Sequence, residues 1–71
     1  MMKTFEITVG ISYSSRRWKG DRKVTQIARH RGQPAVVHYI DLRTYRTGNA
    51  LLPAFASSAN GIAVASIQAA W

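Results

Sequence analysis

Apolar and polar residues alternate near the start of the chain, in the segment TFEITVGI from Thr4 to Ile11. One side of the alternation holds Phe5, Ile7, Val9 and Ile11. A period of two is typical of a half-buried strand. The next segment, SYSSRRWKGD, has no such period and ends in a Gly-Asp turn signal. We therefore predict a strand over residues 4–11 and a long loop after it.

Two further segments favour strands because they are rich in β-branched residues. The segment Arg22–Arg29 places Val24 and Ile27 on opposite faces, so we expect either a β-bulge between them or partial cover of both faces. The segment Ala35–Leu42 is apolar on both faces apart from His38, which is typical of a central strand. The turn residues HRGQPA between the two segments predict a hairpin in which His38 faces Ile27.

The second half of the chain predicts a turn, a short helix and a last strand. The turn falls on Thr47-Gly48-Asn49, since Gly and Asn tolerate positive φ. Pro53 suits a first helical turn and the later Asn-Gly suits its end, so we expect one or two helical turns over Pro53–Ala59. We favour a strand over Ile62–Ile67, although the alanines of the last ten residues also suit a helix.

The resulting order is strand, long loop, strand, turn, strand, turn, strand, helical turn, strand. It resembles the order of elements in an SH3-like small β-barrel domain, with the basic loop after the first strand and the helical turn before the last. The resemblance covers most of the chain and implies a mainly β fold, a small antiparallel barrel of about five strands. The alternative is an antiparallel sheet of three or four strands with a C-terminal helix packed on one face.

The length of 71 residues leaves room for one domain, over residues 1–71, with a small core. The absence of cysteine excludes disulfides and thiolate zinc sites and suits the cytoplasm, and no apolar signal region follows Lys3. No charge occurs from Gly48 to Trp71, but an unbroken apolar run of about 18 residues is missing, so we expect no membrane span. This uncharged third has two interpretations, part of the core or the face of a homodimer, since one chain buries little core.

Charge carries the main functional signal, because ten Lys and Arg residues face three Asp and Glu residues, a net charge of +7. Such a balance favours polyanionic partners, and nucleic acid is the first of these. Most of the cations lie between Arg16 and Arg31, and Arg suits phosphates, base edges and rings better than Lys does. The expected nucleic-acid-binding residues are Arg16, Arg17, Trp18, Lys19, Arg22, Lys23, Arg29, Arg31, Arg43, Tyr45 and Arg46.

The aromatic residues among these cations have two interpretations each. Trp18 and Tyr45, and Tyr13 near them, could offer rings on which unpaired bases stack. Trp18 could instead fold back to cover the core, and Tyr45 could pack against a neighbouring strand. The loop around Arg16–Lys23 and the turn around Arg43–Arg46 are expected to approach the same side of the barrel.

An enzyme is hard to build from these residues. The chain has no cysteine nucleophile and few carboxylates, and in the expected hairpin His30 and His38 do not face each other, so we expect no metal site. Phosphate-loop and dinucleotide motifs are missing, and we expect no cofactor. The alternative function is a protein-interaction or regulatory module, of the kind encoded by phages and mobile elements, that binds an acidic protein. A third hypothesis is an accessory subunit whose sheet is completed by a partner.

Overall fold

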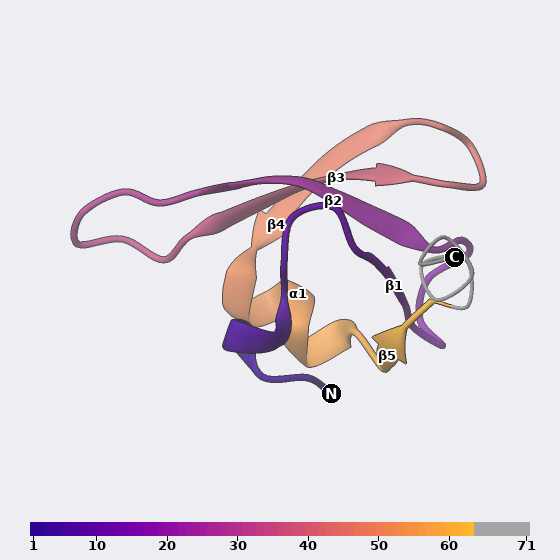
Figure 1. Cartoon of the computed structure of the whole chain (residues 1–71), viewed down its shortest axis with the longest axis horizontal. Helices are drawn as coiled ribbons and strands as arrows, with labels where there is room; N and C mark the ends of the chain where they lie inside the picture. The colour runs from indigo at the N-terminus through magenta and orange to yellow at the C-terminus, as the bar shows by residue number, and fades with distance from the viewer. Residues whose placement is uncertain (64–71) are drawn as a thin grey trace.

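The computed structural model describes residues 1–63, and within them five antiparallel strands form one sheet in the order β4-β3-β2-β1-β5 (Figure 1). The elements in chain order are η1 (Thr4–Glu6), β1 (Ser12–Ser14), β2 (Arg22–Ala28), β3 (Val36–Asp41), β4 (Thr47–Leu51), α1 (Leu52–Ser58) and β5 (Gly61–Ile62). The mainly β fold of about five strands with one short helix is therefore confirmed. The sheet is not closed, since β4 and β5 are its two edges, so its likeness to a barrel is limited to a small five-stranded antiparallel sheet.

The hairpin of β2 and β3 has a bulge, which is one of the two alternatives that the sequence leaves open. Val24 pairs with Tyr39 and Gln26 with His38, so the register shifts by one residue between Val24 and Gln26. The predicted register was wrong by one position, because Ile27 faces Val37 rather than His38. The connection, residues 29–35, is centred on Gly32, whose φ of 77° few other residues adopt.

The prediction of a strand over residues 4–11 was wrong. Residues Thr4–Glu6 form a 3₁₀ turn, Phe5 is 78% exposed, and of the four apolar residues only Ile7 is fully buried. The Tyr13 hydroxyl holds this segment against the sheet by donating to the carbonyl oxygen of Glu6 (2.8 Å) and accepting the N–H of Thr8 (2.7 Å). These bonds replace the ladder bonds of a strand, and β1 starts only at Ser12.

The predicted turn at residues 47–49 was also wrong, because all three residues lie in β4. Gly48 faces Tyr39, and a Cβ at Gly48 would lie 2.7 Å from the Tyr39 ring. Glycine in this strand therefore marks a close approach rather than a turn. The chain turns earlier, between Asp41 and Arg46, where the Asp41 N–H donates to the Arg46 carbonyl oxygen (2.8 Å).

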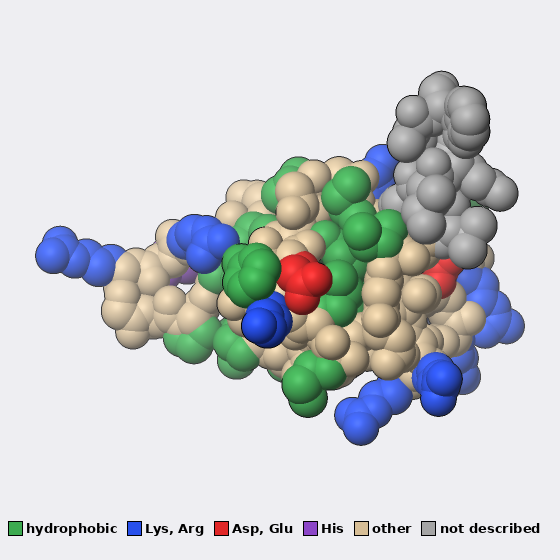
Figure 2. Space-filling view, turned by 60° about the horizontal axis from the view of Figure 1, so that its bottom comes forward, with side chains coloured by type: hydrophobic (Ala, Val, Ile, Leu, Met, Phe, Trp, Pro, Cys, Tyr) green, Lys and Arg blue, Asp and Glu red, His purple; other side chains and the backbone are tan. Residues whose placement is uncertain are grey.

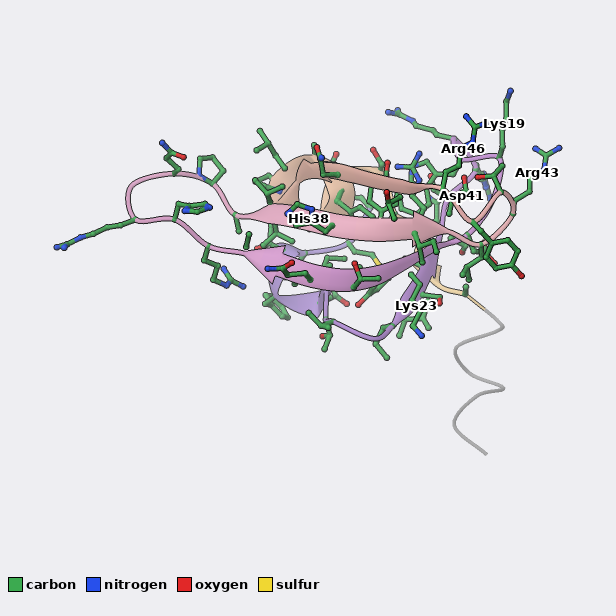
Figure 3. All side chains as sticks on the ribbon, turned by 90° about the horizontal axis from the view of Figure 1, so that it is seen from above. Lys19, Lys23, His38, Asp41, Arg43 and Arg46 are labelled. Atoms are coloured by element: carbon green, nitrogen blue, oxygen red, sulfur yellow. The ribbon has the colours of Figure 1, made fainter. Side chains whose placement is uncertain are left out.

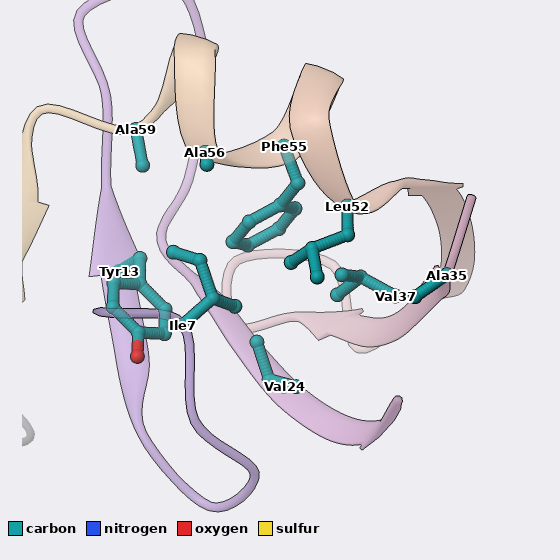
Figure 4. Close-up of a cluster of buried hydrophobic side chains, with 9 residues drawn as sticks. All are labelled: Ile7, Tyr13, Val24, Ala35, Val37, Leu52, Phe55, Ala56 and Ala59. Atoms are coloured by element: carbon teal, nitrogen blue, oxygen red, sulfur yellow. The ribbon is translucent and has the colours of Figure 1, made fainter. Parts of the chain in front are cut away.

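The core lies between the sheet, α1 and the N-terminal segment (Figure 4). Helix α1 matches the predicted helical turns, and Pro53 lies in its first turn as expected. Phe55 of α1 is the centre of the core, with the rings of Tyr13, Trp18 and Tyr39 at 5.8, 5.0 and 5.8 Å from its own. The buried residues of this cluster are Ile7, Tyr13, Val24, Ala35, Val37, Leu52, Phe55, Ala56 and Ala59.

The chain after α1 enters the sheet as β5, which pairs with β1 through Tyr13 and Ile62. The predicted strand over Ile62–Ile67 begins there, and its remainder lies outside the described residues. No helix within residues 1–63 is long and apolar enough to cross a membrane.

Candidate nucleic-acid interface

Two basic segments meet at one end of the sheet. The loop of residues 15–21 leads from β1 into β2, and the turn of residues 42–46 leads from β3 into β4. Arg22 pairs with Asp41 across the ladder, so both connections leave the sheet at the same end. The Leu42 N–H donates to the Asp21 carbonyl oxygen (2.8 Å), which ties the turn to the loop.

We call this region the basic end; its cations are Arg16, Arg17, Lys19, Arg43 and Arg46, all of them exposed. Figure 3 shows Lys19, Arg43 and Arg46 gathered beside Asp41, while Lys23 lies apart from them on β2. The expected approach of the two basic segments is therefore present. Gly20 makes it close, since a Cβ there would lie 2.6 Å from the Cβ of Arg43 and 2.7 Å from Oδ1 of Asp41.

A tight turn at the start of the loop presents two of these arginines. The Ser15 carbonyl oxygen accepts the N–H of Trp18 (3.2 Å), and the Ser15 hydroxyl accepts the N–H of Arg17 (3.1 Å). The Arg16 N–H donates to Oδ1 of Asn60 (2.7 Å), which joins the turn to the residue before β5. Arg16 and Arg17 are the two central residues of this turn, so their side chains project into solvent from a held backbone.

Trp18 points back toward the core, as its interpretation as a packing residue expects. It is half-buried, and its ring lies 5.0 Å from that of Phe55. The guanidinium carbon of Arg22 lies 4.5 Å from the centre of the Trp18 ring and 4.5 Å from the centre of the Tyr39 ring. Arg22 is thus held between two aromatic faces, an arrangement that binds a cation through the ring quadrupole.

Arg22 also carries an unusual donor. Its Nε is buried and has no hydrogen-bond partner among residues 1–63. A buried donor without a partner costs about 1–3 kcal/mol. The rings on either side offset part of that cost, and they leave Arg22 less accessible to a ligand than the exposed arginines of the basic end.

The turn of residues 42–46 is organised by Asp41. Its Oδ1 accepts the N–H groups of Arg43 (2.8 Å) and Thr44 (3.3 Å), and its carbonyl oxygen accepts the N–H of Tyr45 (2.7 Å). Tyr45 has a φ of 59° and is 74% exposed. The interpretation of Tyr45 as a packing partner of a neighbouring strand was therefore wrong.

The remaining predicted site residues lie elsewhere. Arg29 and Arg31 belong to the connection of β2 and β3, which we call the hairpin arm (residues 29–35) and which projects from the opposite end of the sheet (Figure 1). The seven residues of β2 separate the arm from the basic end by about 20 Å. Figure 2 shows Lys and Arg side chains standing out at both ends of the molecule, with hydrophobic side chains between them.

The histidines do not come together either. His30 is exposed in the hairpin arm, whereas His38 lies within β3 between Gln26 and Asn49 of the neighbouring strands. Within residues 1–63 no three His, Asp or Glu side chains gather in a way that could hold a metal ion.

Several residues that shape the basic end were missed by the sequence interpretation, namely Ser15, Gly20, Asp41 and Asn60. Two of them have local signals. Ser and Asp side chains often accept the N–H two residues later, as Ser15 does from Arg17 and Asp41 does from Arg43. The contact of Gly20 with the turn and that of Asn60 with Arg16 join distant parts of the chain and have no local signal.

Comparison of the chain with models of protein families, with curated proteins and with solved structures finds no match. The geometry of the basic end and the charge of the chain therefore carry the functional argument.

Proposed function

We propose that the protein is a small non-enzymatic nucleic-acid-binding domain of the cytoplasm whose basic end contacts phosphates. The observation that supports this most is the packing of two cationic segments, far apart in sequence, against each other at Gly20 and Arg43. Loops that merely carry solvated charge have no need to be docked together. The net charge of +7 supplies long-range attraction to a polyanion.

Asp41 lies among these cations, and its carboxylate is engaged by the turn. Oδ1 of Asp41 accepts two backbone N–H groups. The negative charge of this carboxylate is therefore partly offset by the backbone dipoles of the turn. The Ser15 turn and the Asp41 turn fix the backbone before any ligand arrives. A preformed backbone loses less conformational entropy on binding than a flexible loop does.

The hairpin arm offers a second, weaker contact. Arg29 and Arg31 lie on an exposed connection at the far end of the sheet, so they cannot touch the phosphates that the basic end touches. We propose that they add general attraction, whereas the basic end provides the main contact.

A salt titration of binding to single-stranded DNA, duplex DNA and RNA tests the proposal. The slope of log K against log salt should fall by about 1.4–1.8 when two phosphate contacts are lost. We expect this for the double variant Arg16→Ala and Arg17→Ala. The matched control, Arg29→Ala with Arg31→Ala, removes the same charge and should lower the slope less. An equal loss for both double variants would mean that net charge alone drives binding, and the proposal would fail.

A second candidate function, a protein-interaction module, is favoured by the open edge of β4. No strand of residues 1–63 pairs with the outer side of β4, and the sequence of β4, TGNAL, contains neither charge nor proline to protect it. The Leu52 N–H donates to the Ala35 carbonyl oxygen (2.7 Å), so the alternation of the ladder turns the backbone groups of Thr47, Asn49 and Leu51 outward. An acidic partner strand added here would end beside Arg46.

The substitution Asn49→Pro tests this candidate, because proline removes an outward N–H that an edge strand does not need for its own fold. Capture of one acidic protein by the native chain and its loss in the variant would support the candidate. Binding to nucleic acid should not change in the variant, so the two candidate functions give different results.

A further inference from the structure

Three aromatic rings lie near the cations of the basic end, and two of them already pack against other residues of the protein. Trp18 packs against Phe55 and Arg22, and Tyr39 packs against the same two residues. Tyr45 differs, since within residues 1–63 no ring and no cation packs on it and it is 74% exposed. The Tyr45 ring therefore contributes little burial to the fold.

The backbone at Tyr45 makes this exposure more notable. Its φ of 59° lies in the left-handed region, where a residue other than glycine costs about 1–2 kcal/mol. Glycine or asparagine would fill this position at a lower cost. The Asp41 carbonyl oxygen, which accepts the Tyr45 N–H at 2.7 Å, keeps the residue in this conformation. Strained residues that a surrounding structure enforces are concentrated at functional sites.

Arginines lie close to Tyr45 on both sides in sequence. Arg43 and Arg46 are exposed and belong to the same turn, whose backbone is held by Oδ1 of Asp41 and by the Thr44 hydroxyl, which accepts the Arg46 N–H (3.4 Å). A ring between two cations on a rigid turn combines a stacking surface with phosphate contacts. Proteins that bind unpaired strands use this combination.

We infer that Tyr45 stacks on an unpaired base while Arg43 and Arg46 contact the adjoining phosphates, so that the ligand is single-stranded nucleic acid. This inference rests on the proposed function of the basic end. Bases within a duplex already stack on each other, and extruding one costs a few kcal/mol. Phosphate contacts alone would not distinguish the two forms, whereas stacking on Tyr45 does.

The experiment compares binding of a twelve-nucleotide DNA strand, the RNA strand of the same sequence and the corresponding DNA duplex by fluorescence anisotropy. Stacking of one base is worth about 1–3 kcal/mol, which corresponds to a factor of about 5–150 in affinity. The substitution Tyr45→Ala should weaken binding of both single strands by a factor in this range and change duplex binding by less than about twofold. Tyr45→Phe keeps the ring and should bind like the native chain.

The matched control is Phe5→Ala, which removes an exposed aromatic ring in η1, outside the basic end, and should leave all three affinities unchanged. Equal effects of Tyr45→Ala on single strands and duplex, or no effect, would overturn the stacking inference while salt-dependent binding kept the proposed function intact. Binding to one strand only would show that the sugar is read as well as the base. If none of the three ligands binds in a salt-dependent way, the proposed function fails and the inference fails with it.

Discussion

Arg22 and Trp18 form a cation–π pair, with the guanidinium carbon 4.5 Å from the centre of the indole ring. Because Trp18 also packs on Phe55, the pair connects the basic loop to the core. The loop of residues 15–21 is therefore held at Trp18, through Arg22 at the start of β2, while Arg16, Arg17 and Lys19 remain in solvent. The cations proposed to bind a ligand and the cation that packs on the core therefore lie within one short segment.

Replacing Trp18 with alanine should lower the free energy of unfolding by about 2–4 kcal/mol, because a half-buried indole leaves a cavity above Phe55 and Arg22 loses one of its rings. Urea unfolding followed by far-UV circular dichroism measures this. The neighbouring Lys19→Ala, at an exposed position, should change stability by less than about 0.5 kcal/mol. Similar values for the two variants would show that Trp18 does not anchor the loop.

Replacing Tyr13 with phenylalanine should cost about 1–3 kcal/mol, because the Glu6 carbonyl and the Thr8 N–H both lose their hydrogen bond to the hydroxyl. Thermal unfolding gives the value, and amide hydrogen exchange should show faster exchange at Thr8. Tyr45→Phe is the control, since the hydroxyl it removes belongs to an exposed side chain. An unchanged melting temperature for Tyr13→Phe would contradict the role assigned to this hydroxyl.

Replacing Gly20 with alanine should separate the basic loop from the turn, because the new methyl group would lie 2.6 Å from the Arg43 Cβ and 2.7 Å from Oδ1 of Asp41. We expect a loss of about 1–3 kcal/mol in stability, as for other overpacked sites, together with weaker nucleic-acid binding. Gly61→Ala is the control, since a Cβ there meets nothing within 4 Å. Native affinity in a destabilised Gly20→Ala variant would show that docking of the two segments is not needed for binding.

Replacing Tyr45 with asparagine should change stability and binding in opposite directions. Asparagine tolerates a φ of 59° better than tyrosine does, and the ring buries little surface, so unfolding should become harder by about 0.5–1 kcal/mol. Affinity for single strands should fall as it does for alanine. Differential scanning calorimetry measures the stability, and anisotropy measures the affinity for single strands. A variant in which both quantities rise, or neither rises, would contradict this account of Tyr45.

The sequence predicted the hairpin of β2 and β3 well because its signal is local. Turn residues surround Gly32, and the mismatched parity of Val24 and Ile27 indicates the bulge that the register shows. The start of α1 was predicted to within one residue from Pro53, which suits a first helical turn.

The conformation of the N-terminal segment could not be predicted because it depends on the Tyr13 hydroxyl, whose bonds to the backbone leave no signal in the residue pattern. The alternation of Phe5, Ile7 and Val9 is that of a strand, yet bonds from Tyr13 occupy the backbone groups of Glu6 and Thr8. A short, serine-rich segment around Tyr13 took the place in the sheet instead, and residue patterns do not reveal which of two adjacent segments a large buried ring will favour.

The candidate site was predicted in part. Its exposed arginines follow from composition, and the approach of the two basic segments follows from the order of the strands. The different roles of the aromatic residues do not follow from the sequence, because they depend on which ring reaches Phe55. Trp18 and Tyr39 reach it, whereas the left-handed backbone at Tyr45 turns that residue away from the core.

The hairpin arm has a practical consequence. Residues 29–34 are all exposed, a Cβ at Gly32 would meet nothing within 4 Å, and only Ala35 at the end of the arm belongs to the core. Exposed connections of this kind accept insertions and new chain ends. The arm is thus the place where a label or a second module can be inserted into this protein while the basic end stays whole.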